Sequence, residues 1–173
     1  MNIYPKIIIT QDMISEAKKM IESTRVKRTV ASPFDTLTGH LGEYVFADYF
    51  YGNWKLNNVG NNKGESDFED IEIKASAFPF SERLNLLVRE DYARNRKPKC
   101  YVQVIISIKN RYVKDIYPGT MAYICGFATS DEVDNSPLRD WGSKFGRSGG
   151  YRCHYISVKN LRPISNLKSY LSG

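Results

Sequence analysis

Three residues in the middle of the chain have the types and the spacing that metal-assisted phosphate chemistry requires: Asp67, Glu72 and Lys74. Mg²⁺ prefers oxygen ligands and commonly binds one or two carboxylates together with substrate phosphate, and Asp67 and Glu72 can supply that pair. Lys74 lies two residues after Glu72, and in a strand this spacing places both side chains on one face. An ammonium group there can orient or help to deprotonate an attacking water, or stabilise charge that develops on phosphate. The three residues therefore predict a metal site suited to phosphodiester cleavage.

Two further oxygen donors belong to this hypothesis. The backbone carbonyl of Ile73 can add a ligand between Glu72 and Lys74, and Glu43 could meet the same cation directly or through water. From Glu43 to Glu72 the chain carries seven acidic residues and two lysines, a net charge of −5, although the whole chain has a formal net charge of +6. An acidic segment within a basic protein suits a metal-dependent enzyme that acts on phosphates.

A β-hairpin that turns at residues 69–70 is predicted to position the acids. Apolar and polar residues alternate directly after this turn, which is typical of a strand with one apolar face. A two-residue turn sets Phe68 opposite Ile71 and Asp67 opposite Glu72, and residues paired in this way share a face. Two like charges so placed repel each other, so the arrangement favours a bound cation between them.

Two helices are predicted before the hairpin, over residues 11–23 and 33–51. Thr10 can cap the first helix. The second begins with Ser32 as its cap and Pro33 in the first helical position, and it should end at Gly52. Glu43 then lies within the second helix, bordered by apolar residues on its own face, where burial is costly unless a positive group meets it.

The remaining pattern predicts mainly strands. They are expected near residues 54–59, 84–89, 101–109, 121–128 and 151–158. A short helix or turn is expected at 131–133, a loop over 135–150 and a short terminal helix around 165–171. Two helices followed by about five strands indicate a single α+β, or mixed α/β, domain.

Composition bounds the class of protein. The chain has 173 residues, of which 42% are hydrophobic and 13% aromatic, which fits one folded domain and excludes wholesale disorder. No apolar run approaches the roughly 20 residues of a membrane span, and the first residues do not form a signal peptide. The three cysteines are odd in number and widely spaced, which disfavours a disulfide framework or a zinc finger. We therefore expect a cytoplasmic protein with no membrane partner.

The Asp67-x4-Glu72-x-Lys74 pattern resembles the motif of the PD-(D/E)XK nuclease superfamily, which has the restriction-endonuclease-like fold. The segment Leu41-Gly-Glu43-Tyr-Val-Phe is similar to the first core helix of that family, whose acid often joins the metal site. Tyr101-Val-Gln103-Val-Ile is similar to the strand after the motif hairpin, where a Gln often lies near the active site.

The resemblance extends over roughly residues 36–165. The segment 122–133 is similar to a later strand that leads into a "GxAT-x-E-E-V" type of turn in relatives of phage and restriction origin. Ser66 stands where the name of the motif has a proline, a position that varies within the superfamily. The small size and the resemblance together favour a phage or mobile-element source.

The resemblance implies a fold, a site and an activity. The fold would be a restriction-endonuclease-like core with a mixed central sheet flanked by helices, in one domain over 1–173 with 1–30 as an N-terminal helical extension. The implied catalytic residues are Glu43, Asp67, Glu72, Lys74 and Gln103, and the implied metal ligands are Asp67, Glu72, Ile73 and Glu43. The implied activity is hydrolysis of DNA phosphodiester bonds with Mg²⁺, for which Mn²⁺ can substitute.

Two alternatives stay open. The chain could be a catalytically inactive DNA-binding or assembly module with the same fold, or a repair or junction nuclease that prefers structured DNA. A homodimer would suit cleavage of both strands, although nothing in the sequence specifies an interface.

The distribution of charge points to a polyanionic partner such as DNA. Residues 1–90 carry 11 basic and 13 acidic groups, a net charge of −2, whereas residues 91–173 carry 14 basic and 6 acidic groups, a net charge of +8. The candidate DNA contacts are Arg83, Arg94, Arg96, Lys97, Lys99, Arg139, Lys144 and Arg147.

Overall fold

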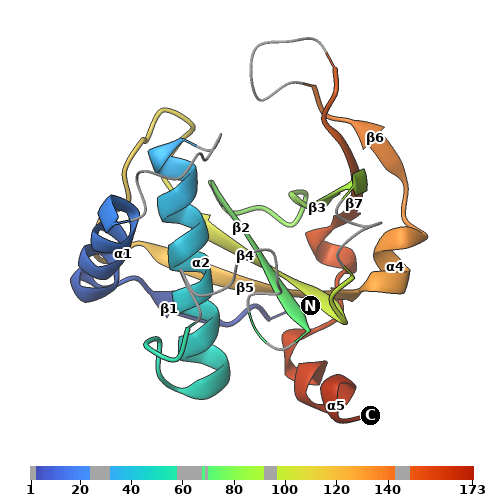
Figure 1. Cartoon of the computed structure of the whole chain (residues 1–173), viewed down its shortest axis with the longest axis horizontal. Coiled ribbons are helices and arrows are strands. Elements are labelled where there is room, and N and C mark those ends of the chain that lie inside the picture. Colours follow the sequence, from blue (N-terminus) through green and yellow to red (C-terminus); the bar gives the residue numbers. More distant parts are fainter. Residues whose placement is uncertain (1–2, 24–31, 58–67, 69, 92–96, 143–148) are drawn as a thin grey trace.

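The computed structural model describes residues 3–23, 32–57, 68, 70–91, 97–142 and 149–173. The helices are α1 (Gln11–Ser23), α2 (Pro33–Tyr51), α4 (Ser130–Asp134) and α5 (Leu167–Ser172), with 3-10 turns at Val158–Asn160 and Ile164–Asn166. The strands are β1 (Lys6–Ile8), β2 (Ile71–Phe78), β3 (Asn85–Arg89), β4 (Cys100–Ser107), β5 (Met121–Thr129), β6 (Leu138–Asp140) and β7 (Arg152–Ser157). The architecture is α+β, with two sheets flanked by helices (Figure 1).

Local signals place the two long helices where the sequence predicts them. The Thr10 hydroxyl accepts from the backbone N–H of Met13 at 3.2 Å and so caps α1. The Ser32 hydroxyl caps α2 by accepting from the N–H of Asp35 at 3.1 Å, with Pro33 in the first turn. Gly52 ends α2 with φ of 75°, a left-handed conformation that glycine adopts without steric cost. The predicted bounds of both helices are confirmed.

Sheet A holds four strands in the order β1-β5-β4-β2, and it is mixed, because β2 runs parallel to β4 whereas the other neighbours are antiparallel. Sheet B holds three antiparallel strands in the order β3-β7-β6. The mixed sheet and its flanking helices agree with the predicted fold class, whereas the second sheet was not anticipated. Within the described residues, β2 forms one edge of sheet A.

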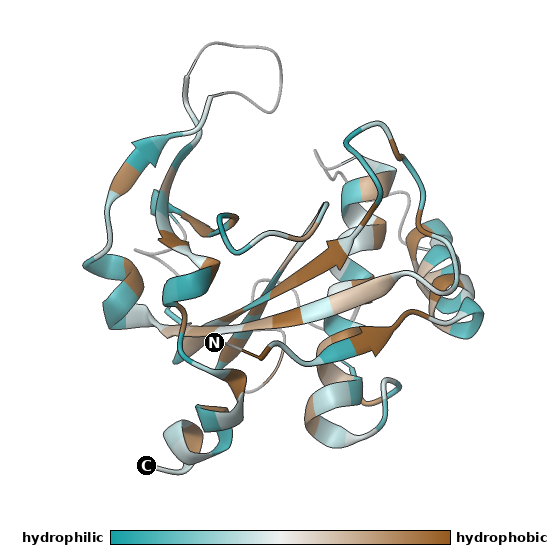
Figure 2. Ribbon diagram, turned by 180° about the vertical axis from the view of Figure 1, so that it is seen from behind, coloured by the Kyte–Doolittle hydropathy of each residue, from teal (hydrophilic) through white to brown (hydrophobic). Residues whose placement is uncertain are grey.

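Two hydrophobic cores share sheet A. The first lies between α1, α2 and one face of the sheet, which presents Ile71, Ile73 and their neighbours on β4. The second lies on the opposite face, where Tyr101 and Ile105 meet residues of sheet B such as Leu86. Apolar segments accordingly concentrate in the central strands, while the outer turns are hydrophilic (Figure 2).

The predicted hairpin turn is present. Phe68 and Ile71 form an isolated antiparallel bridge with reciprocal backbone hydrogen bonds of 3.0 and 2.7 Å. Asp70 takes φ of 59°, the positive value found at the second central residue of a type I′ hairpin turn. The pairing of Phe68 with Ile71 is therefore confirmed.

Two sequence predictions are corrected. Residues 54–57, the described part of the strand predicted at 54–59, form a turn in which Leu56 N–H bonds to the Asn53 carbonyl at 3.1 Å. The stretch 135–150, predicted as a loop, contains strand β6, whose residues pair with β7. Both errors have one cause, because short segments become strands only when a partner strand is adjacent.

Candidate active site

Glu72 and Lys74 lie on strand β2, on the face of sheet A that looks toward sheet B. Both side chains share this face because they are two residues apart in a strand. The Nζ of Lys74 lies 3.8 Å from Oε1 of Glu72, and the side chains are 24% and 28% exposed, respectively. At this distance the contact is an ion pair rather than a hydrogen bond. The remaining exposure leaves both groups within reach of a ligand.

Strand β4 brings two buried polar side chains to the same face. In the parallel register, Glu72 lies opposite Tyr101 and Lys74 lies opposite Gln103. Gln103 is 1% exposed, and its Nε2 donates to the carbonyl of Val104 at 3.0 Å. The structure thus places Gln103 beside Lys74. Its amide is buried and donates one hydrogen bond to the backbone of its own strand.

Tyr101 is a neighbour of the site to which the sequence assigned no role. Burial raises the pKa of Tyr101 to about 12, and the negative charges of Glu72 and Asp134 add to the effect, while a hydrogen bond with Ser130 opposes it. The phenol therefore keeps its proton at neutral pH and cannot serve as a general base. Its position opposite Glu72 depends on the parallel pairing of β2 with β4, which no local pattern reveals.

Glu43 belongs to helix α2, which packs on strand β2. It follows Gly42 on α2, and Gly42 packs so closely on Ala75 of β2 that an added Cβ would overlap the Ala75 methyl group. Ala75 belongs to the face of β2 opposite Glu72. Glu43 is half-buried and its Oε1 is fully buried. The helix that carries Glu43 thus covers one face of β2, whereas Glu72 lies on the opposite face. One cation could meet both carboxylates only around the edge of this strand.

Asp67 lies outside the described residues, so its predicted pairing with Glu72 stays a prediction. The Phe68–Ile71 bridge nevertheless fixes the register of the hairpin directly beside it. Continuation of that antiparallel register by one residue pair would set Asp67 opposite Glu72.

The chemistry of the donor set is compatible with Mg²⁺. Within the described part of the chain, no group of three or more His, Cys, Asp or Glu side chains is arranged to hold a metal ion. Mg²⁺ does not need such a group, because it retains several waters and uses one or two carboxylates plus phosphate. The Glu72 carboxylate and the Ile73 carbonyl are hard oxygen donors on one strand. Glu43 and Asp67 would complete the predicted set.

The described candidates for DNA contact lie in several environments. Arg83 is exposed in the turn before β3. Lys97 pairs with Asp134 at 2.8 Å, and this hydrogen bond raises the pKa of the lysine. Lys99 donates to the carbonyl of Leu171 at 3.3 Å, so its charge is held against α5. Outside the described residues lie Arg94, Arg96, Lys144 and Arg147.

Arg139 is the remaining described candidate for a DNA contact. Its guanidinium lies 4.4 Å from the ring centre of Trp141, close enough for a cation–π interaction. Arg139 is exposed on strand β6.

The cysteines take no part in this site. Cys100, Cys125 and Cys153 are all free, as their number and spacing predict, and all three are buried. Burial raises the pKa of Cys100 and of Cys125 to about 12. Both thiols therefore stay protonated, and neither can act as a nucleophile near neutral pH.

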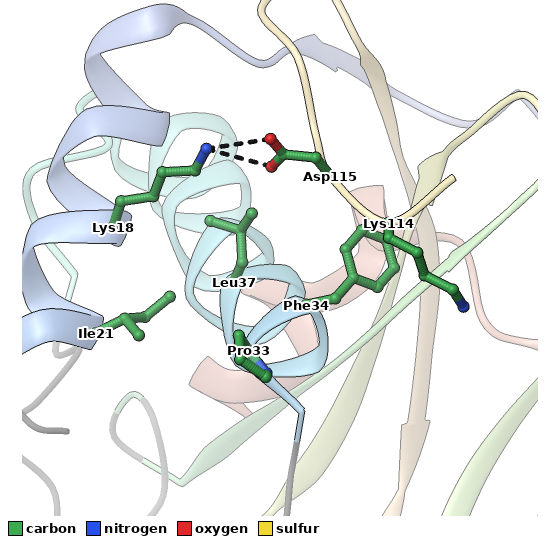
Figure 3. Close-up of a pocket in the computed structure, with 7 residues that line it drawn as sticks. All are labelled: Lys18, Ile21, Pro33, Phe34, Leu37, Lys114 and Asp115. Carbon is green, nitrogen blue, oxygen red and sulfur yellow. Dashed lines mark hydrogen bonds and ion pairs between the residues drawn. The ribbon is translucent and has the colours of Figure 1, made fainter. Parts of the chain in front are cut away.

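A pocket of about 170 Å³ lies away from these residues, between α1, the start of α2 and the connection from β4 to β5 (Figure 3). Its lining is mainly apolar and includes Ile21, Phe34 and Leu37. Lys18 and Asp115 close one side through an ion pair of 3.2 Å. None of the candidate catalytic residues lines this pocket.

The fold and the site define an α+β protein with a mixed sheet, whose edge strand carries an acid and a lysine side by side. Comparison with protein-family models, with curated proteins and with solved structures gives no match to this chain. In the part of the chain that the structure describes, no helix is both long and apolar enough to cross a bilayer.

Proposed function

We propose that this protein is a Mg²⁺-dependent deoxyribonuclease with a restriction-endonuclease-like core. One observation carries the proposal: Glu72 and Lys74 lie 3.8 Å apart at alternate positions of an edge strand, partly exposed, in a protein whose formal net charge is +6. A carboxylate beside an ammonium group at a sheet edge suits the binding of a metal ion and a phosphate together.

Each residue then has a distinct task. Glu72 and the Ile73 carbonyl would hold Mg²⁺, together with Asp67 and Glu43. The bound ion would supply Lewis-acid stabilisation of the charged phosphate. Lys74 would orient the attacking water and neutralise charge that develops on the phosphate oxygens. Gln103 would help to position the substrate or the water beside Lys74.

The Glu72–Lys74 ion pair also has a consequence for the resting protein. The ammonium group of Lys74 partly offsets the negative charge of Glu72. The protonated Tyr101 phenol cannot accept a proton from water. Among the described polar groups on this face, Lys74 can orient the attacking water by donating hydrogen bonds from its ammonium group.

Replacement of Lys74 tests the proposal. We expect Lys74→Ala to lower cleavage of plasmid DNA in Mg²⁺ or Mn²⁺ by roughly 10²–10⁴-fold, the usual contribution of a positioned proton-transfer group. Metal and DNA binding should persist, since the carboxylates remain. Lys74→Arg should not restore full activity, because guanidinium hardly deprotonates and has a planar donor geometry. Lys6→Ala, at the opposite edge of sheet A, is the matched control and should cut at the wild-type rate.

The same assay separates the alternatives. A wild-type protein that binds DNA but cuts no substrate in either metal would be the inactive binding or assembly module. Faster cutting of junctions or flaps than of linear duplex would identify a structure-selective nuclease. A Lys74→Ala protein that cuts at the wild-type rate would remove this lysine from the mechanism.

A DNA substrate also bears on location and assembly. The proposed location is the cytoplasm, and the proposed substrate is the DNA that the protein would meet there. Two copies of the site in a homodimer would allow both strands of a duplex to be cut. Sedimentation of the protein with and without a short duplex would show whether two copies assemble.

A further inference from the structure

The connection between β4 and β5 concentrates positive charge at its outer part. Lys109, Arg111 and Lys114 are all exposed within six residues. The carboxylate of Asp115, the acid that follows them, is engaged by Lys18 at 3.2 Å. Within the described residues, none of the three cations forms an ion pair with an acid. Their charge is therefore available to an external anion.

Local contacts hold this basic loop, residues 109–114, in one shape. The side chain of Asn110 accepts from the N–H of Tyr112 at 2.9 Å, and its carbonyl accepts from the N–H of Val113 at 3.3 Å. Arg111 donates to the Tyr112 hydroxyl at 2.7 Å, and its guanidinium lies 4.9 Å from that ring centre. Tyr112 is nevertheless 73% exposed. The loop thus presents an aromatic ring and cations together.

A second projection combines the same two kinds of side chain. In the β6–β7 hairpin, Arg139 lies over Trp141, which packs edge-on against Tyr155 with ring centres 5.4 Å apart. Asp140 accepts from the N–H groups of Gly142 and Gly150, each at 2.9 Å. These hydrogen bonds lower the pKa of Asp140 and fix the base of the hairpin loop.

Both projections rise at the same end of the molecule. Figure 1 shows the connection from β4 to β5 (yellow) and strands β6 and β7 (orange to red) in the upper part of the molecule, and Figure 2 shows the same arrangement from behind. The end of strand β2 lies between them in both views. Strand β1, the turn after α2 and helix α5 lie toward the opposite end.

We propose that the basic loop and strand β6, with Arg139 and the adjacent Trp141, together bind the backbone of a DNA duplex, with strand β2 between the two contacts. Lysine and arginine side chains bind phosphates through charge, and a two-stranded β-ribbon can enter the major groove. The proposal rests on the proposed function in naming DNA as the partner. It goes further by assigning binding to Lys109, Arg111 and Lys114, for which the sequence offered no specific signal.

Charge reversal at the two ends of the molecule tests this surface. One variant carries Lys109→Glu, Arg111→Glu and Lys114→Glu. Its matched control carries Lys6→Glu, Lys55→Glu and Lys168→Glu, three exposed lysines on β1, after α2 and on α5. Both variants change the net charge equally. Binding to a labelled duplex of random sequence is measured by fluorescence anisotropy across a range of salt concentrations. EDTA is present to remove divalent metal ions and so prevent cleavage.

We expect the loop variant to lose roughly tenfold or more in affinity, and its salt-dependence slope to fall by about 2 to 3, since each phosphate contact contributes about 0.9. The control should change little, because charges beyond about 8 Å are screened at physiological salt. Equal losses of affinity in the two variants would show that binding depends only on net charge, which would overturn the proposal. An unchanged affinity of the loop variant would also overturn it. Thermal melting verifies that both variants fold.

The two tryptophans provide an independent test, because they lie toward opposite ends of the molecule: Trp141 follows β6 and Trp54 follows α2. In a Trp54→Phe protein, DNA should quench the fluorescence of Trp141. In a Trp141→Phe protein, the fluorescence of Trp54 should stay nearly constant. The reverse pattern would place the DNA at the wrong end of the molecule and overturn the proposal.

Failure of this proposal can be told from failure of the nuclease function. A protein that cuts DNA in a Lys74-dependent manner, yet binds DNA equally well after charge reversal in the basic loop, would refute the proposed binding surface. The proposed nuclease function would then still stand. A protein that shows the expected binding difference but cuts nothing would refute the function and leave the surface intact.

Discussion

Glu72 and Lys74 owe their proximity to the alternation of side chains along one strand, which needs no distant contact. The properties of that pair depend on what surrounds it. Tyr101 lies opposite Glu72, and burial keeps its phenol protonated. At the scale of single residues, strand β2 supplies the two charged groups, and strand β4 places a buried, protonated phenol beside them.

His40 is a second residue whose protonation follows from burial. Burial on α2 lowers its pKa below the ordinary value of 6.5, and a hydrogen bond with the backbone of Ala17 opposes the shift only in part. Well above pH 6.5 the ring is neutral in both the folded and the unfolded chain. As pH falls below 6.5, the unfolded chain binds the proton first, so the free energy of unfolding decreases.

We therefore expect His40→Gln to flatten the loss of stability between about pH 6.5 and pH 5, a window above the ordinary carboxylate pKa values. Urea denaturation of both proteins at pH 8, 7, 6 and 5 measures the difference. Identical pH dependence in the two proteins would contradict this account of His40.

At the scale of elements, the approach of α2 to β2 depends on one glycine. Gly42 faces Ala75 so closely that a Cβ at this position would overlap the methyl group of Ala75. Gly39 lies on the same helix, but a Cβ there would meet nothing within 4 Å. The two glycines therefore form a matched pair for testing helix packing.

We expect Gly42→Ala to destabilise the protein by about 1–3 kcal/mol, because overpacking forces α2 away from the sheet. Gly39→Ala should instead stabilise it by up to about 1 kcal/mol, since alanine favours helix where glycine does not. Urea denaturation gives both values. Equal effects of the two substitutions would show that α2 does not depend on this close contact.

At the scale of the whole molecule, sheet A separates two cores, and within the described residues strand β2 forms one of its edges. Helices α1 and α2 cover one face, and sheet B covers the other. This arrangement leaves the β2 edge, with Glu72 and Lys74, between two buried layers. Binding there should therefore stabilise the entire fold.

Mg²⁺ should raise the melting temperature if it binds at this edge. A ligand that binds only the folded state adds RT ln(1 + [L]/Kd), about 2.7 kcal/mol at a 100-fold excess over Kd. We expect Glu72→Gln to abolish this shift, which differential scanning calorimetry measures. The control Glu22→Gln, an exposed acid on α1, should retain it. A melting temperature of the wild type that does not change in millimolar Mg²⁺ or Mn²⁺ would count against the metal site.

The sequence alone determined the features that depend on near neighbours. The bounds of α1 and α2 follow from Thr10, Ser32, Pro33 and Gly52, which act on adjacent backbone groups. The turn before β2, and the shared face of Glu72 and Lys74, follow from local alternation in the same way.

Tertiary structure decided which strands pair and what surrounds the site. The division into two sheets, the parallel pairing of β2 with β4 and the strand character of β6 all require partners distant in sequence. The strand predicted at 54–59 fails in its described part for the same reason, since Trp54 packs against Tyr44 and the chain turns there. Backbone hydrogen bonds between strands are alike for every residue type except proline, so a local pattern can indicate a strand without indicating its partner.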